Sequence, residues 1–272
     1  MGNRFDAPAT YEAAAKDYEQ ASARYWAFMG KRTVDRLNLQ TGAWVLDVPC
    51  GPGSSALPAA EAVGPEGHVV AVDLAPQMIV LAREKARRSH LTNIEFVLAD
   101  MTRLDFPSEK FDAVICVLGL FFVEDMVHQA KQLWHLVKPG GQLAITTFER
   151  HFFTPLYAIW KEQMQAELQE EELIGPWERT NDPNVMRQIL NEAGVPNMEL
   201  SIEKEELPLP KPEVWWEIVL GTGMRKWVME LDKQAAARVR KQNLRWATEH
   251  GVHTLTVSSI YATATKESKT ER

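Results

Sequence analysis

A short apolar run followed at once by a turn rich in glycine and proline occupies residues 43–53. Residues 44–48 are apolar apart from Asp47, as expected for a strand buried in a parallel sheet. Two glycines and a series of small residues follow over 51–60. Glycine lacks a Cβ and lets the backbone approach a ligand closely, and the start of a helix offers free N–H groups beside such a turn. The pattern therefore predicts a strand, a ligand-binding turn and the beginning of a helix.

A second apolar run, residues 68–73, ends in Asp73, which lies 26 residues after Asp47. An acid at the end of the second strand is well placed to accept hydrogen bonds from the hydroxyls of a ribose. Either acid by itself is explained equally well as a solvated residue at the end of a strand. Two acids at this spacing around a glycine turn favour a nucleoside-binding site.

Five segments of the chain, in this order, resemble the motifs of class I S-adenosylmethionine (SAM)-dependent methyltransferases. The resemblance is closest to the small-molecule type that includes the ubiquinone and menaquinone biosynthesis enzymes. It extends over about 34–150, whereas residues 151–272 match only in general plan. The segments are 45–53, 72–78, 99–101, 111–116 and 136–141.

The resemblance implies that the chain binds SAM, with S-adenosylhomocysteine (SAH) as the product. The glycine turn would hold the methionine end, Asp73 the ribose, and Asp100 with Met101 the adenine, while backbone carbonyls at Val117 and Leu118 would hold the amine. The cofactor-binding residues predicted in this way are Asp47, Pro49, Cys50, Gly51, Gly53, Asp73, Leu74, Met78, Asp100, Met101 and Val117.

Several of these residues have simpler explanations. Asp100 is also the kind of acid that forms a turn after a strand, and Cys50 fits its place by small size without any role as a nucleophile. Pro49 stands where the family more often has glycine or alanine. In the family an aromatic residue before the first motif often touches the methionine end, and Tyr11 or Tyr18 is the candidate here. The alternative for both tyrosines is packing of a helix on the sheet.

Alternating strands and helices predict an α/β fold with parallel βαβ units. The resemblance implies a Rossmann-like seven-stranded sheet in the order 3-2-1-4-5-7-6, the last strand antiparallel. We expect residues 1–150 to form the SAM-binding core with an N-terminal helical segment, and 151–272 to supply the last two strands and helical insertions over the substrate (about 151–182 and 208–250). Strands are predicted over 44–48, 68–73, 93–98, 111–117, 142–148, 198–207 and 252–265, and helices over 10–37, 54–63, 76–88, 124–136, 151–172, 184–193, 213–220, 224–230 and 233–250.

Nine tryptophans are many for a chain of this length, and five of those in the expected insertions are candidates for the wall of a binding site. Aromatic walls suit a planar acceptor that is apolar or cationic. Small helical insertions also use large side chains to build a core, and the two interpretations are equally well supported. The same choice between core and pocket wall applies to the phenylalanines at 121 and 122. The five tryptophans are Trp160, Trp177, Trp215, Trp216 and Trp227.

A general base is needed only if the methyl acceptor carries a proton that must be lost. His151 is the candidate because it follows the fifth strand at the edge where ligands bind. His128 and His135 are expected on the surface or in packing contacts. No histidine has acidic or cysteine partners at the spacing of metal ligands, so we predict no metal site.

Composition limits the kinds of partner. The net charge is −7 and no basic stripe is present, so nucleic acid is not an expected partner, and the basic residues of 83–88 are explained as the solvated face of a helix. We find neither a signal pattern nor an apolar run near the ~18–20 residues that a membrane span requires. Two cysteines without a disulfide framework suit a reducing compartment. We therefore expect a cytoplasmic protein.

The preferred prediction is a methyltransferase that acts on the oxygen, nitrogen or carbon of a small, aromatic or apolar acceptor. A protein that binds SAM or SAH without catalysis is one alternative, and detection of methyl transfer would exclude it. A nicotinamide-dependent oxidoreductase is another, but its Gly-x-Gly-x-x-Gly pattern is absent, since Ser-Ser-Ala follows Gly53.

Overall fold

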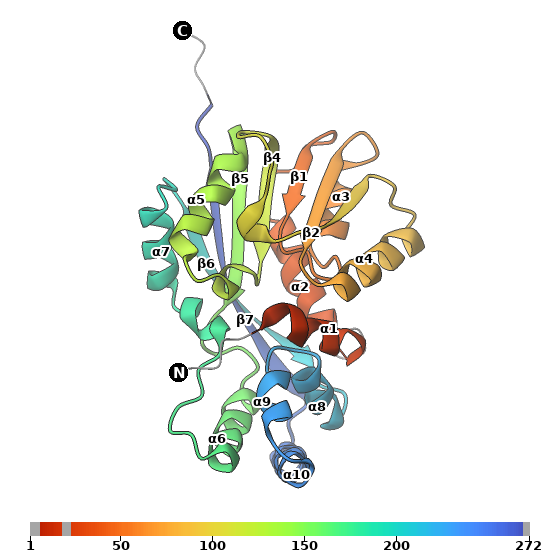
Figure 1. Cartoon of the computed structure of the whole chain (residues 1–272), viewed down its shortest axis with the longest axis vertical. Coiled ribbons are helices and arrows are strands. Elements are labelled where there is room, and N and C mark those ends of the chain that lie inside the picture. The colour runs from red at the N-terminus through yellow and green to blue at the C-terminus, as the bar shows by residue number, and fades with distance from the viewer. Residues whose placement is uncertain (1–5, 18–22, 269–272) are drawn as a thin grey trace.

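The computed structural model describes residues 6–17 and 23–268, and its centre is a seven-stranded sheet in the order β3-β2-β1-β4-β5-β7-β6 (Figure 1). β7 pairs antiparallel with both β5 and β6, and the remaining pairs are parallel. The predicted fold class and strand order are therefore confirmed. The strands are β1 Trp44–Asp47, β2 His68–Asp73, β3 Ile94–Leu98, β4 Phe111–Val117, β5 Val137–Phe148, β6 Glu199–Pro208 and β7 Thr254–Thr265.

Helices cover both faces of the sheet because its central strands are apolar on both sides. Val45 and Ile115 contact the cluster that includes α2, α3 and α4, whereas Leu46 and Val114 contact the cluster that includes α5 and α7. This alternation follows from the two-residue period of a strand. The helices are α1 Ala7–Asp17, α2 Ala23–Val34, α3 Ala56–Val63, α4 Pro76–Arg88, α5 Met126–Leu136, α6 Leu156–Leu168, α7 Pro183–Glu192, α8 Glu213–Leu220, α9 Arg225–Glu230 and α10 Lys233–Glu249, with short 3-10 segments η2 Met101–Arg103, η3 Leu120–Phe122 and η4 Pro176–Thr180.

Three predicted boundaries are wrong. The helix expected over 10–37 consists of α1 and α2, with residues 18–22 outside the described part of the chain. β5 begins at Val137 instead of residue 142, because Val137 pairs with Phe111 across an irregularity in the register. The helix expected over 151–172 begins only at Leu156, since the backbone N–H of Phe153 donates to the Thr256 carbonyl of β7.

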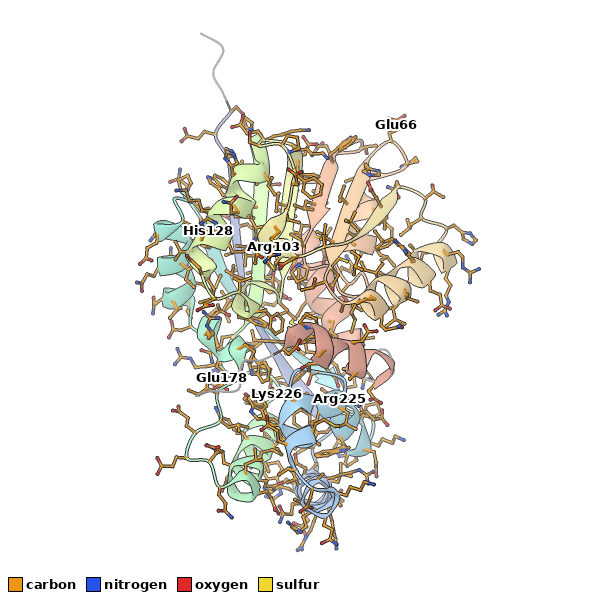
Figure 2. The ribbon with its side chains drawn as sticks, viewed as in Figure 1. Glu66, Arg103, His128, Glu178, Arg225 and Lys226 are labelled. Atoms are coloured by element: carbon orange, nitrogen blue, oxygen red, sulfur yellow. The ribbon has the colours of Figure 1, made fainter. Side chains whose placement is uncertain are left out.

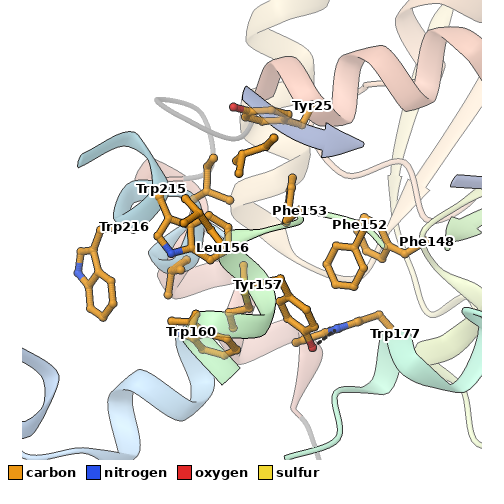
Figure 3. Close-up of a cluster of buried hydrophobic side chains, with 14 of the residues drawn as sticks. Tyr25, Phe148, Phe152, Phe153, Leu156, Tyr157, Trp160, Trp177, Trp215 and Trp216 are labelled. Atoms are coloured by element: carbon orange, nitrogen blue, oxygen red, sulfur yellow. Dashed lines mark hydrogen bonds between the residues drawn. The ribbon is translucent and has the colours of Figure 1, made fainter. Parts of the chain in front are cut away.

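A helical lobe made of α6, α8, α9 and α10 lies beyond the carboxyl end of the sheet, around the extensions of β6 and β7 (Figure 1). Its core is aromatic, and Trp160 and Trp215 have no exposed surface (Figure 3). All five of the candidate tryptophans belong to this core, and none of them lines the cavity described below. The packing interpretation of these tryptophans is therefore confirmed.

Among the described residues, no helix combines the length and apolar character that crossing a membrane demands.

Candidate functional site

A cavity of about 500 Å³ lies over the carboxyl ends of β1 to β5, between the sheet and α1. This is the edge at which open parallel sheets bind ligands. Nine of the predicted cofactor-binding residues line the cavity, namely Pro49, Cys50, Gly51, Asp73, Leu74, Met78, Asp100, Met101 and Val117. Asp47 and Gly53 do not line it.

The glycine turn and the acid of β2 are joined directly. The backbone N–H of Gly51 donates to Asp73 Oδ2 at 2.8 Å, and the N–H of Ala75 donates to Oδ1 at 2.8 Å. Burial raises the pKa of Asp73, and these hydrogen bonds oppose the rise. Each carboxylate oxygen can accept more than one hydrogen bond, so both remain able to receive hydroxyl donors from the cavity.

Two glycines of the turn have the left-handed backbone conformation that favours glycine. Gly53 also has no room for a side chain, because a Cβ there would lie 2.1 Å from Cδ1 of Leu57. Gly53 therefore shapes the turn from behind, and the prediction that it lines the cavity is not supported.

Asp47 lies beneath the turn and is fully buried. Ser55 donates to its Oδ2 at 2.8 Å, whereas Oδ1 has no hydrogen-bond partner in the described part of the chain. Burial raises the pKa of Asp47 to about 8, the Ser55 bond opposes the rise, and the nearby charge of Asp73 adds to it. Asp47 supports the turn and lies outside the cavity wall.

Asp100 has both of the properties that the sequence suggested. Its Oδ1 accepts from the backbone N–H and from the hydroxyl of Thr102, each at 2.8 Å, which caps η2. It also lines the cavity beside Met101. The turn-forming role and a place at the ligand edge are therefore compatible.

α1 forms a cover over the cavity, to which it contributes Ala7, Pro8 and Tyr11, and Asp6 just before the helix also lines it. Tyr11, one of the two tyrosines predicted to touch the ligand, lines the cavity; Tyr18 lies outside the described residues. Burial raises the pKa of the Tyr11 phenol, and the nearby Asp73 charge adds to the rise.

Two further contacts hold α1 in place. At its middle, Glu12 Oε2 accepts from the backbone N–H of Gln77 on α4 at 3.1 Å. At its end, Asp17 Oδ2 accepts from Arg225 Nη1 of α9 at 2.7 Å. Arg225 lies on the side of α9 toward α1 (Figure 2). The cover is therefore attached both to the sheet layer and to the helical lobe.

The remaining wall of the cavity is apolar and aromatic, with Trp26 of α2, Phe121 and Phe122 of η3, and Phe148 at the end of β5. Both phenylalanines at 121 and 122 thus line the cavity, and Phe121 also packs in the lobe core. Trp26 and Phe148 were not predicted. Only the position of Phe148, at the end of a predicted strand, gave any signal in the sequence.

His151, the predicted general base, does not line the cavity. Its Nδ1 lies 2.8 Å from Oε1 of the buried Glu149, and its side chain is 53% exposed. Burial alone would raise the pKa of Glu149, but hydrogen bonds from Ser258 and from the backbone and ring of His151 outweigh it and lower that pKa. The prediction is therefore not supported, because the chain turns the imidazole toward this carboxylate.

The other candidate residues show no reactive arrangement. His128 lies on the outer side of α5 (Figure 2), and His135 is also exposed. Cys50 and Cys116 are buried free thiols, and burial raises the pKa of both, which disfavours the thiolate form. A search of the described residues finds no cluster of histidine, cysteine, aspartate and glutamate that would hold a metal ion.

Comparison with known proteins finds relatives of the part of the chain that forms most of the cavity. Residues 45–141 match the family described as a methyltransferase domain. A demethylmenaquinone methyltransferase of Listeria welshimeri is 38% identical over 114 residues, which are 42% of this chain and 48% of the relative. The aklanonic acid methyltransferase DauC of a Streptomyces species is 34% identical over 137 residues, 50% of this chain and 62% of the relative. The chain thus spans about half to three fifths of the length of these curated relatives.

Solved structures extend the likeness of the fold beyond the matched domain. A putative methyltransferase from Bacillus halodurans has a TM-score of 0.59 and 18% identity, with 87% of this chain and 98% of that chain covered. A SAM-dependent methyltransferase from Aquifex aeolicus has a TM-score of 0.53 and 16% identity, with 92% and 98% covered. At these identities the likeness concerns the arrangement of helices and strands.

Proposed function

We propose that the chain transfers a methyl group from SAM to a small-molecule acceptor and releases SAH, because residues 45–141 match the family described as a methyltransferase domain and the fold is that of solved methyltransferases. One observation carries the proposal. The glycine turn and Asp73 are hydrogen-bonded to each other at the cavity wall, where the family binds the methionine and ribose parts of its cofactor.

When bound, SAM supplies an activated methyl group on a positively charged sulfur. Such a donor would give its methyl group to an oxygen, nitrogen or carbon nucleophile, with SAH as the leaving product. In this chain Asp73 would orient the ribose, Asp100 and Met101 would enclose the adenine, and α1 would exclude water from above. Placement of two reactants at attack distance is worth roughly 7–11 kcal/mol, so the residues of this chain act by positioning.

The acceptor that the cavity supports is aromatic or apolar, because one wall consists of Trp26, Phe121, Phe122 and Phe148. The relatives are named for demethylmenaquinone and aklanonic acid, which are small molecules. The net charge of −7 supports the absence of a nucleic-acid partner. Two buried free cysteines support a cytoplasmic location.

Replacement of Asp73 tests the assignment. In Asp73→Ala we expect SAH affinity, measured by isothermal titration calorimetry, to fall at least about tenfold, or about 1.4 kcal/mol, because the ribose hydroxyls lose their acceptor. Asp105→Ala, which removes an exposed acid outside the cavity, is the matched control and should bind as the wild type does.

Two results would contradict the proposal: no heat on adding SAH to the wild-type protein, or unchanged SAH affinity in a folded Asp73→Ala protein. Titration with NADH tests the oxidoreductase alternative, and we expect no binding. Conversion of SAM to SAH on addition of an acceptor separates an enzyme from a protein that only binds the cofactor.

A further inference from the structure

The cavity wall has two parts that differ in chemistry. Over β1, β2 and β3 it consists of the glycine turn, Asp73 and the Asp100 turn, which are the groups assigned to the cofactor. Over β4 and β5 it consists of Leu118, η3 with Val123 and Glu124 after it, and Phe148, together with Trp26 of α2. If SAM occupies the first part, the methyl acceptor must occupy the second.

The second part is bounded by a continuous series of rings that reaches from α2 to the cover. Successive ring centroids lie 5.6 Å apart for Trp26 and Phe148, 6.1 Å for Phe148 and Phe121, 4.6 Å for Phe121 and Phe122, and 5.7 Å for Phe122 and Tyr11. These separations are typical of packed aromatic pairs. We call these five residues, Tyr11, Trp26, Phe121, Phe122 and Phe148, the aromatic arc. Because its members come from four different elements and support one another, the arc offers a preformed apolar surface.

The charged side chains that line the cavity have one sign. Of the lining residues that the structure describes, those that carry a charge at neutral pH are acids, and no lysine, arginine or histidine is among them. The carboxyl groups belong to Asp6, Asp73, Asp100 and Glu124, and the guanidinium of Arg179 lies behind η3, bonded to the carbonyls of Phe121, Val123 and Glu124. An anionic group on the acceptor, away from the positively charged sulfur of SAM, would therefore lose its hydration without gaining a cation from the cavity wall, and would lie near carboxylates.

Resting on the proposed function, which puts SAM over β1 to β3, we propose that the aromatic arc binds an uncharged aromatic acceptor and rejects acceptors that carry a carboxylate. The acceptor class is thus restricted by charge as well as by shape. Phe122 is a specificity-determining residue in this scheme, because it joins the arc on η3 to Tyr11 on the cover and is only partly buried.

A matched pair of probes tests the charge selection. Naphthol and hydroxynaphthoate share a ring system and a hydroxyl, and only the second carries a carboxylate. We expect calorimetry in the presence of saturating SAH to show at least about tenfold tighter binding of naphthol, as expected for an unpaired buried charge. Equal or tighter binding of hydroxynaphthoate, or no binding of either probe, would overturn the proposal.

Substitutions of Phe122 test the role of the arc. Phe122→Ala should weaken naphthol roughly tenfold, as is typical for a buried aromatic contact, and leave SAH affinity within about twofold. Phe122→Arg adds a cation at the arc and should reduce the preference for naphthol over hydroxynaphthoate at least about tenfold. Phe106, another partly buried phenylalanine, lies outside the cavity lining, so Phe106→Ala and Phe106→Arg are matched controls that should keep the wild-type preference.

The outcomes separate the two proposals. Loss of SAH binding in the wild-type protein would refute the proposed function whatever the probes do. Normal SAH binding together with an unchanged probe preference in folded Phe122→Arg would refute the charge selection alone.

Discussion

Asp47 and Asp73 carry the same side chain and end neighbouring strands, but the fold gives them different surroundings. Asp73 accepts two backbone hydrogen bonds and faces the cavity, whereas Asp47 is enclosed beneath the glycine turn with one oxygen unpaired among the described residues. Desolvation disfavours the charged form of a carboxyl group and so raises its pKa. Because the pKa of Asp47 is raised to about 8, this group stays protonated in the folded protein at neutral pH.

This difference predicts a pH dependence of stability. The pKa of Asp47 is about 8 in the folded protein, against 3.8 for an exposed aspartate. The contribution of this group to the free energy of unfolding is therefore fully present below pH 3.8 and is lost as the pH rises through about 8. Between roughly pH 5 and pH 8 the free energy of unfolding should therefore fall by about 3.5 kcal/mol from this group.

Asp47→Asn should remove this dependence of the free energy of unfolding on pH, because asparagine does not titrate. The asparagine can still accept the hydrogen bond from Ser55. Urea unfolding of both proteins without ligand, at several pH values, measures the difference. Parallel pH profiles for the wild-type and variant proteins would show that Asp47 does not titrate in this way.

At the scale of elements, α1 connects the two halves of the molecule. It lies over the cavity, contacts α4 through Glu12, and is joined to α9 through Asp17 and Arg225. The ion pair is partly shielded, with 32% and 20% of the two side chains exposed. Partly exposed ion pairs contribute little to overall stability, but this one joins α1 to α9 in addition to the packing of α1 against α8 and α9.

We expect Asp17→Asn to lower SAH affinity about twofold to fivefold, because the cover is then less often closed over the cavity. Calorimetry on Asp17→Asn, Arg225→Gln and the double variant should give a coupling energy of about 0.5–1 kcal/mol. Asp35→Asn is the control, since it breaks an exposed pair with Lys31 on α2 and should leave SAH affinity unchanged. Strictly additive effects of the two substitutions would mean that the ion pair does not hold the cover.

At the scale of the whole molecule, the helical lobe does not have a core of its own. The cluster that contains Trp160 and Trp215 also includes Phe148 of β5, Trp26 of α2, and Leu255 and Val257 of β7. Trp215 is in addition hydrogen-bonded to Asn243 of α10 at 2.7 Å. Since one set of contacts spans both parts, we expect the sheet and the lobe to unfold together. The division of the chain at residue 150, into a SAM-binding core and a part that carries the last two strands and the insertions, stays a prediction.

Trp215→Ala should lower the free energy of unfolding by about 3–5 kcal/mol, as is usual for removal of a buried aromatic side chain. The midpoints followed by tryptophan fluorescence and by far-ultraviolet circular dichroism should shift together. Trp44→Ala, at a position that is 43% exposed, should cost less than about 1 kcal/mol. A fluorescence transition that moves alone would indicate a lobe that unfolds independently.

The sequence by itself determined the elements, their order and most of the cofactor side of the cavity. The signals were local: apolar runs of strand length, the glycine turn, and the spacing from Asp47 to Asp73. Local patterns of this kind predict where a strand ends and which residues follow it. Nine of the eleven predicted cofactor residues consequently line the cavity.

The acceptor side was decided only by the tertiary structure. The ring centroids of Trp26 and Phe148 lie 5.6 Å apart although 122 residues separate the two positions, whereas the lobe tryptophans turn inward into the core that the lobe shares with the sheet. His151 faces Glu149 because the chain leaves β5 in that direction, and Asp47 is covered because the turn folds back over it. These outcomes depend on which apolar surfaces, distant in the sequence, pack together and are removed from water. No short segment of the sequence shows which surfaces will do so.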